Sequence, residues 1–161
     1  SHTTPTDFRP ISLSSFLLKT LERILEEHIK ANISPNKLSI SQHAYCKGKS
    51  TETALNSLVT EIEKSMYNKE FTLVAFLDIE GAFNNILGAS EIKKKVSRGS
   101  PQGGVLSPLL WVLALNSLLK SLEERGQHVV AYADDVAMVV RGKFPNTLIE
   151  IMQDLLNMVE N

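Results

Sequence analysis

Apolar residues recur at helical spacing in the first part of the chain. In residues 15 to 31 they lie three and four positions apart, and Ser14 and Ser15 just before them favour a helix start, because their hydroxyls can accept from its first N–H groups. After a polar stretch the same spacing returns, which predicts a second helix beginning at Ser50 or Thr51. The N-terminal part is therefore predicted to be helical.

Two further helices are predicted in the second half of the chain. Ser107 and Pro108 favour a helix start, and Gly126 favours its end. The first turns of this helix are apolar on nearly every side, which predicts that it is buried. The last helix is predicted around Thr147, which stands with Glu150 at the spacing of a capping box.

Three apolar runs lack helical spacing and predict strands. Residues 71 to 79 have no polar face, as expected of a central strand covered on both sides. Residues 129 to 132 and 136 to 140 flank Asp134 and Asp135, which predicts a hairpin with two carboxylates at its tip. From residue 71 onward the order is strand, helix, strand, strand, helix, and the predicted fold class is α+β.

Length and composition fit one globular domain, since the chain has 161 residues, 43% of them apolar and 22% charged. Residues 1 to 100 carry 13 basic and 11 acidic side chains and the rest carry 4 and 7. The net charge of −1 creates no strong field toward nucleic acid or an anionic membrane. The single cysteine, Cys46, excludes an internal disulfide and a multi-cysteine zinc site. The longest apolar run, residues 109 to 115, is too short to cross a bilayer, so we expect no membrane partner and an intracellular protein, nuclear or cytoplasmic.

Three carboxylates accompany the predicted strands. Asp78 ends an apolar strand, where an ionised side chain must be exposed, paired or bound to a cation. Asp134 and Asp135 raise the same question, although aspartates at hairpin tips are most often solvated turn residues. If the strand lies beside the hairpin, the three carboxylates converge, and such a cluster is stable mainly with Mg²⁺. Two ions about 4 Å apart can activate a hydroxyl and stabilise a leaving oxygen, which favours nucleotidyl transfer.

A glycine-rich segment, residues 98 to 108, lies between these carboxylates along the chain. Its glycines permit close backbone approach, Gln102 supplies amide donors and an acceptor, and the segment leads into a helix N-terminus, which favours anions. The simpler interpretation is a flexible connector. The one dense basic run of the sequence, Lys93, Lys94 and Lys95, is either a solvated face or a set of phosphate contacts.

Several short motifs follow one another in order along nearly the whole chain. They are FRPISL at residues 8–13, QHAY at 42–45, KST at 49–51, LDIEGAFN at 77–84, RGSPQGGVLSPLLW at 98–111 and YADD at 132–135. In this order they resemble the reverse transcriptases of non-LTR (LINE-type) retrotransposons, especially those of insects. Ordered motifs are far more specific than YADD alone.

The resemblance implies a right-hand polymerase, with a partial fingers segment in residues 1 to 70 and a truncated, ferredoxin-like palm in residues 71 to 161. It implies an RNA template, a DNA primer and deoxynucleoside triphosphates as partners, and no oligomeric state is predicted. The implied metal ligands and catalytic residues, for two Mg²⁺ ions, are Asp78 and Asp134 with Asp135 beside them. The implied substrate-binding residues are Arg9 at the triphosphate, Phe83 against the ribose 2′-hydroxyl, Gln102 and Gly103 in the nucleotide and template pocket, and Tyr132.

From the residues alone, simpler interpretations stand beside these roles. Phe83 could equally be an aromatic residue of the hydrophobic core, and Arg9 could equally be a cation on the surface. The order of the motifs favours the functional interpretation over the simpler one.

Some positions depart from the family pattern. Only residues 86 to 96 separate the first aspartate motif from Arg98, where family members have several tens of residues, which indicates an internal deletion. Asn84 replaces an aspartate, no lysine precedes Phe8, and the final palm strand and the thumb are expected beyond Asn161. A sheet without its last strand exposes an edge. We therefore expect weak or no polymerase activity from this chain alone.

Two other functions stay open. One is a non-catalytic, domesticated remnant that binds nucleic acid or a protein, for which Asp78→Asn would leave function unchanged. The other is a different palm-type cyclase or polymerase that uses the same hairpin carboxylates. The second leaves the FRPISL motif and the glycine-rich segment unexplained.

Overall fold

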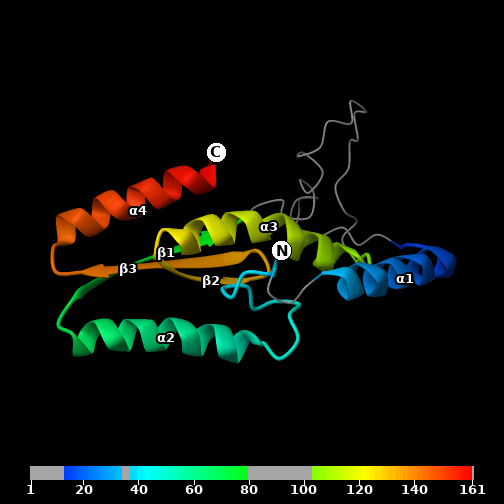
Figure 1. Ribbon diagram of the computed structural model, residues 1–161, viewed down its shortest axis with the longest axis horizontal. Coiled ribbons are helices and arrows are strands. Elements are labelled where there is room, and N and C mark those ends of the chain that lie inside the picture. The colour runs from blue at the N-terminus through cyan, green and yellow to red at the C-terminus, as the bar shows by residue number, and fades with distance from the viewer. Residues whose placement is uncertain (1–12, 34–36, 80–102, 161) are drawn as a thin grey trace, which may run out of the picture. The chain divides into compact units, whose positions relative to one another are not determined.

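The computed structural model of this chain describes residues 13–33, 37–79 and 103–160. In these ranges the chain forms helices and a small sheet, which makes the fold α+β as predicted (Figure 1). The elements are α1 (Phe16–Asn32), α2 (Thr51–Tyr67), β1 (Phe71–Asp78), α3 (Ser107–Glu124), β2 (His128–Tyr132), β3 (Asp135–Gly142) and α4 (Pro145–Glu160). The predicted order from residue 71 onward is confirmed. None of the helices in the described ranges is long and apolar enough to cross a membrane.

The chain divides into two compact units. The first combines Ser1–Ser34 with Gly81–Trp111, and the second combines Pro35–Glu80 with Val112–Asn161. The sheet, α2 and α4 all belong to the second unit, which also holds the carboxylates of interest.

In the first unit, α1 begins one residue after Ser15, whose Oγ accepts from the Leu18 N–H at 3.3 Å. This confirms the predicted helix and its cap. Glu22 Oε2 accepts from the Val105 N–H at 2.7 Å, which ties α1 to the segment just before α3. The apolar side chains of α1 form a stripe along the helix, and none of them is buried among the described residues.

The second unit is built on an antiparallel sheet in the order β1-β3-β2. The central strand is β3, whose residues 136–140 are all buried. The prediction that residues 71 to 79 form the central strand is therefore wrong for the described sheet. β1 lies at its edge, where Phe71 is 57% and Phe76 is 73% exposed. An apolar run indicates that both faces of a strand are apolar, but it does not fix the neighbours, because pairing depends on long-range register.

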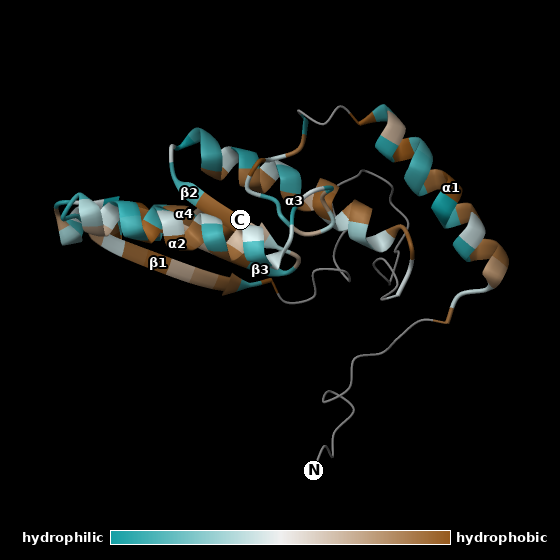
Figure 2. Ribbon diagram, turned by 90° about the horizontal axis from the view of Figure 1, so that it is seen from below, coloured by the Kyte–Doolittle hydropathy of each residue, from teal (hydrophilic) through white to brown (hydrophobic). Residues whose placement is uncertain are grey.

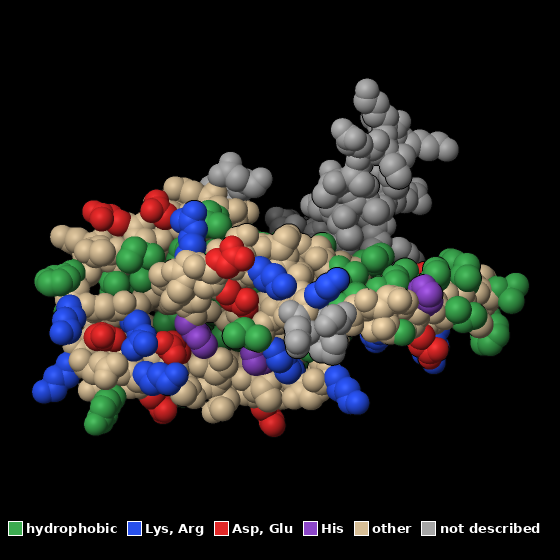
Figure 3. All heavy atoms as spheres, viewed as in Figure 1, with side chains coloured by type: hydrophobic (Ala, Val, Ile, Leu, Met, Phe, Trp, Pro, Cys, Tyr) green, Lys and Arg blue, Asp and Glu red, His purple; other side chains and the backbone are tan. Residues whose placement is uncertain are grey.

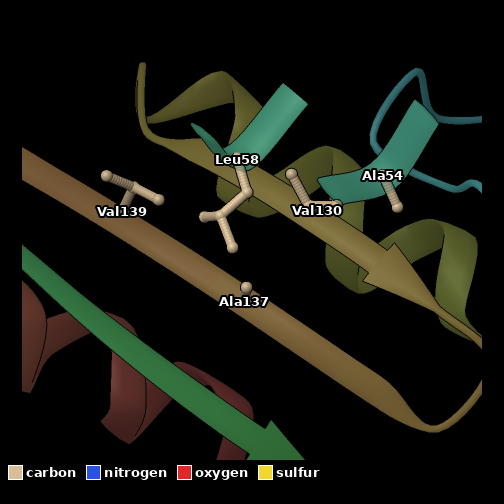
Figure 4. Packing of buried hydrophobic residues seen from close by; sticks show 5 residues of the cluster. All are labelled: Ala54, Leu58, Val130, Ala137 and Val139. Carbon is tan, nitrogen blue, oxygen red and sulfur yellow. The ribbon is translucent and has the colours of Figure 1, made fainter. Parts of the chain in front are cut away.

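One face of the sheet packs against α2. Ala54 and Leu58 of this helix meet Val130 of β2 and Ala137 and Val139 of β3 (Figure 4). Burial of each larger apolar side chain in this layer contributes about 1.5–3 kcal/mol.

The other face is covered by α4 and by α3 from Val112 onward (Figure 1). Leu119 and Leu122 of α3, Met138 of β3 and Leu155 of α4 are almost completely removed from solvent. The expectation that α3 is buried is confirmed for its inward side, whereas Ala114 and Ser117 on its other side are exposed.

Three further predicted helix ends are confirmed. Ser50 caps α2 through a reciprocal capping box with Thr53. α3 begins at Ser107, and Gly126 follows its end with φ of +73°, a conformation that glycine adopts without strain. The Gly126 N–H donates to the Glu123 carbonyl at 2.8 Å and closes the last turn.

The predicted capping box at Thr147 and Glu150 is wrong. α4 begins two residues earlier, at Pro145, and the Leu148 N–H donates to the Phe144 carbonyl at 3.3 Å. Proline at the first helical position loses no hydrogen bond and has the required φ, so Pro145 fixes the start in place of the threonine.

The outer edge of β2 is covered by the segment that precedes α2. Gln42 forms a parallel bridge with Ala131, whose N–H donates to the Ser41 carbonyl at 2.8 Å and whose carbonyl accepts from the His43 N–H at 2.8 Å. Periodicity did not predict this contact, because the segment is neither helical nor alternating.

Candidate functional site

Asp78 and Asp135 meet at one end of the sheet. Asp78 is the last residue of β1 and lies directly opposite Asp135, the first residue of β3. One step further along, the Ile79 N–H donates to the Asp134 carbonyl at 3.0 Å. The expected juxtaposition of the strand that ends at residue 78 with the carboxylate hairpin is therefore present.

A tight turn joins β2 to β3 and carries Asp134. Tyr132 pairs with Asp135 across the hairpin, which leaves Ala133 and Asp134 as its two connecting residues. Ala133 has φ of +55°, and this left-handed conformation costs a non-glycine residue about 1 kcal/mol. The short connection fixes Asp134 at the tip, beside the end of β1.

Asp78, Asp135 and Tyr132 lie on the sheet face that α2 covers. Directly opposite residues of an antiparallel pair point to the same face, and Tyr132 packs against the α2 side of the core. A cavity of about 410 Å³ adjoins these three residues, with Leu55 of α2 and Phe76 of β1 among its apolar walls. The two carboxylate residues are exposed, so water and ligands can reach them.

No metal cluster is assembled in the described part of the chain. Within it, no group of three or more His, Cys, Asp or Glu side chains is arranged to hold a metal ion. The chemistry of the donors nevertheless fits Mg²⁺. Asp78, Asp134 and Asp135 are all carboxylates, and the exposure of Asp78 and Asp135 leaves room for the water and phosphate oxygens that complete a magnesium shell.

Tyr45 approaches the hairpin tip from the segment before α2. Burial, followed by the nearby Asp134 carboxylate and the Tyr132 phenol, raises the pKa of Tyr45 above its ordinary value. The phenol therefore keeps its proton and remains a hydrogen-bond donor at neutral pH. Sequence reasoning placed Tyr45 only within the QHAY motif, and that motif was the available signal for its proximity to the carboxylates.

His43 and Lys49 hold the same segment in place. His43 Nδ1 lies 2.9 Å from Thr53 Oγ1, and Lys49 Nζ donates to the carbonyls of Ile40 and Gln42, the latter at 2.8 Å. Burial, and then the positive charge of Lys49 and the neighbouring His128 side chain, lower the pKa of His43. Lys49, an isolated cation in the sequence, thus satisfies backbone carbonyls.

Four further residues were predicted to bind substrate, namely Arg9, Phe83, Gln102 and Gly103. Arg9, Phe83 and Gln102 lie outside the described residues. Gly103 belongs to the first unit and has φ of +97°, which glycine adopts readily.

Comparison with known proteins gives a family match over almost the whole chain. Residues 2–161 match the family described as "Reverse transcriptase (RNA-dependent DNA polymerase)". The "Retrovirus-related Pol polyprotein from type-1 retrotransposable element R1" of Bradysia coprophila is 28% identical over 179 residues, which cover 91% of this chain and 18% of that protein. The "RNA-directed DNA polymerase from mobile element jockey" of Drosophila melanogaster is 25% identical over 183 residues, covering 87% of this chain and 20% of that protein. The chain spans about a fifth of the length of these relatives.

The relatives are longer than this chain within the matched region. Alignments of 179 and 183 residues exceed the 161 residues of this chain. The relatives therefore contain residues, within the matched region, that have no counterpart here.

Proposed function

This chain belongs to the reverse transcriptase family, with non-LTR retrotransposon proteins among its relatives, and from that premise we propose that it catalyses template-directed nucleotidyl transfer. We assign residues 1 to 70 to a partial fingers segment and residues 71 to 161 to a truncated palm with a ferredoxin-like sheet. The strand order β1-β3-β2, with α3 and α4 on one face, supports the palm assignment. The proposed partners are an RNA template, a DNA primer and deoxynucleoside triphosphates.

The pairing of Asp78 with Asp135, next to the Ile79–Asp134 hydrogen bond, carries this proposal. Asp78, Asp134 and Asp135 would hold two Mg²⁺ ions. When bound, such ions activate the attacking hydroxyl of a primer and neutralise charge on the leaving phosphates.

The residues of the chain itself supply position and selectivity. Ladder pairing fixes the backbone of Asp78 against the hairpin, so these residues already lie side by side before a ligand arrives. Tyr132, beside the cavity, and the protonated Tyr45 offer an aromatic surface and a donor near the tip. Arg9, Phe83, Gln102 and Gly103 are the proposed contacts to the triphosphate, sugar and template.

We propose that the activity of this chain alone is weak. The relatives hold residues in the matched region that this chain lacks, which supports a shortened wall around the nucleotide. The net charge of −1 provides little attraction for a primer-template, whose affinity comes largely from phosphate contacts.

A second candidate is a non-catalytic module that binds nucleic acid or a protein. It is favoured by one observation, the longer matched region of the relatives, which contains residues that have no counterpart here. In this case the sheet and its hairpin persist as a scaffold, and Asp78→Asn would leave binding unchanged.

Primer extension on an RNA template with Mg²⁺ tests the proposal. We expect slow addition of a few nucleotides by the wild type. Asp134→Ala removes a proposed metal ligand. Substituting a residue that only hydrogen-bonds to a metal ligand typically lowers activity roughly 10- to 100-fold, so we expect a larger decrease in the extension rate here. The matched control is Asp154→Asn, an exposed carboxylate on α4, which should extend the primer as the wild type does.

The outcomes separate the candidates. Equal extension by wild type and Asp134→Ala would contradict the assigned chemistry. Robust processive synthesis by the wild type would contradict the proposed weakness. Absence of extension, with primer-template binding that Asp78→Asn does not change, would favour the non-catalytic module.

A further inference from the structure

Residues 39–43, which we call the edge segment, cover the outer side of β2. The Ala131 N–H donates to the Ser41 carbonyl, and the Ala131 carbonyl accepts from the His43 N–H, each at 2.8 Å. β2 is hydrophobic over most of its length, as its brown colour in Figure 2 shows. The edge segment therefore occupies backbone groups of an apolar strand that would otherwise be open to another strand.

Titratable side chains hold both ends of the edge segment. At one end, Glu123 of α3 accepts hydrogen bonds from Ser39 and Ser41. At the other end, His43 is only 8% exposed, and its Nδ1 lies 2.9 Å from Thr53 Oγ1 of α2. The edge segment is therefore fixed by two groups that acid can protonate.

The hydrogen bonds of Thr53 determine which nitrogen of His43 carries the proton of the neutral ring. Thr53 Oγ1 donates its single proton to the Ser50 carbonyl at 2.8 Å and accepts from the Ser50 N–H at 2.9 Å. Toward the imidazole it can then only accept, so we assign the proton to Nδ1. Nε2 is left bare, and no hydrogen bond joins it to another of the described residues.

The charged neighbours of His43 disfavour a second proton on its ring. Lys49 carries a positive charge in the same stretch of chain, and His128 of β2 lines the same cavity of about 320 Å³ as His43. Burial, and then these two neighbours, lower the pKa of His43. The closed arrangement therefore favours the neutral imidazole.

The other elements around this cavity do not offset the repulsion. From α2, Thr53 contacts the ring and Ser57 lines the cavity, and both are uncharged. From α3, Glu123 also lines the cavity, but its carboxylate already accepts from the edge segment and is near the positive charge of Lys120. A proton added to Nε2 thus enters a buried position that has no acceptor among the described residues.

We propose that the edge segment is an acid-sensitive cover, which releases the edge of β2 when Nε2 of His43 takes up a proton. In the open arrangement the imidazolium reaches water, so the open form binds the proton more tightly than the closed form. Opening is therefore favoured as the pH falls below about 6.5, whereas the Glu123 end keeps its charge down to about pH 4.5. The cover uses no residue of the candidate site, so it stands independently of the proposed function.

Amide hydrogen exchange of the 161-residue chain, measured by NMR at pH 7 and pH 5.5, tests the cover. After division by the intrinsic rates, exchange of the Ala131 N–H should be faster at pH 5.5, up to a limit of about eightfold for one group with an open-state pKa of 6.5. The amides of β3, which lies between β1 and β2, should change less.

His43→Asn separates the effect of this histidine from other effects of acid. The amide can still donate to Thr53 but takes up no proton, so the corrected exchange rate of Ala131 should be the same at both pH values. His28→Asn is the matched control. His28 is exposed on α1, so its substitution should retain the increase seen in the wild type.

The nitrogen chemical shifts of the imidazole rings give a test that needs no substitution. In the wild type at neutral pH, His43 should carry its proton on Nδ1. This measurement keeps the proposal testable if His43→Asn impairs folding.

Several results would overturn the proposal. Unchanged exchange of Ala131 in the wild type would exclude an acid-sensitive cover. An equal increase at Ala131 and in β3 would mean that acid destabilises the whole sheet, and an equal increase in the wild type and His43→Asn would assign the effect to another group. A proton on Nε2 of His43 at neutral pH would contradict the arrangement on which the cover depends.

Discussion

Glu123 holds the segment before α2 against the rest of the second unit. Its Oε1 accepts from the Ser39 hydroxyl, from the Ser41 N–H at 3.0 Å and from the Ser41 hydroxyl at 2.6 Å. Asn116, two helical turns earlier, accepts from the Ser39 N–H at 2.7 Å. A single carboxylate on α3 thus positions the backbone that covers the edge of β2.

The pKa of Glu123 reflects this role. Burial alone would raise it, but the hydrogen bonds from Ser39 and Ser41 outweigh burial and hold the pKa below its ordinary value of 4.5. A carboxyl whose pKa is lower in the folded chain stabilises the fold above its unfolded pKa. This stabilisation is lost as the pH falls below about 4.5 and through the folded pKa.

We expect Glu123→Gln to lower the free energy of unfolding at pH 7 by about 1–3 kcal/mol, because a neutral amide oxygen accepts these hydrogen bonds more weakly than a carboxylate oxygen does. The loss of stability below pH 4.5 should also be smaller than in the wild type. Urea unfolding at pH 7 and pH 4 measures both effects. Glu124→Gln, on the adjacent and exposed residue, is the control, and equal effects of the two substitutions would show that Glu123 has no special role.

At the scale of the element, the start of α2 determines where this helix lies against the sheet. Ser50 Oγ accepts from the Thr53 N–H at 3.3 Å, and Thr53 Oγ1 accepts from the Ser50 N–H at 2.9 Å. Thr53 Oγ1 also lies 2.9 Å from His43 Nδ1, so the cap joins the helix to the preceding segment.

Ser50→Ala should destabilise the protein by about 1 kcal/mol, because the first turn of α2 loses its side-chain acceptor. The change should appear as a lower midpoint in urea unfolding with an unchanged slope. Ser117→Ala, at an exposed serine within α3, should shift the midpoint far less. Equal shifts would mean that the capping box does not contribute.

Most of the elements could be predicted from the sequence, because caps and apolar spacing are local signals. Ser15, Ser50 and Gly126 mark helix ends as their chemistry requires. The edge position of β1 could not be predicted, since which strands pair depends on contacts between residues far apart along the chain. Pro145 outweighed the capping-box spacing at Thr147 because proline at the first helical position is favourable on its own.

For the candidate site, the sequence makes the approach of Asp78 to the hairpin a condition, which the pairing of β1 with β3 fulfils. The contribution of Tyr45 and Glu123 could not be predicted from spacing. Both act through a segment without regular structure, whose position is fixed by side-chain hydrogen bonds rather than by periodicity.

At the scale of the whole molecule, the balance of charge governs contact with nucleic acid. Lys and Arg side chains lie among Asp and Glu side chains on the face shown in Figure 3, and the net charge is −1. Affinity for a primer-template must therefore come from local groups of cations. The densest group in the sequence is Lys93, Lys94 and Lys95.

Replacing these three lysines by glutamine should weaken primer-template binding and reduce the salt dependence of log K by a slope of about 2–3, because each phosphate contact contributes slightly less than one. Fluorescence anisotropy at a series of salt concentrations measures the slope. A control with the same change in net charge replaces Lys19, Lys69 and Lys143, and its slope should stay close to that of the wild type. Equal slopes for the two triple variants would indicate that net charge alone matters.

Ala131 connects the segment before α2 with the strand that leads to the carboxylate hairpin. This residue binds the segment before α2 on one side and lies three positions before Asp134 on the other. The irregular segment and the strand that leads to the carboxylate tip are therefore joined through a single residue. Because Ser41, Gln42 and His43 are themselves buried, a change that displaced this segment would disturb the interior of the fold and the edge of β2 together.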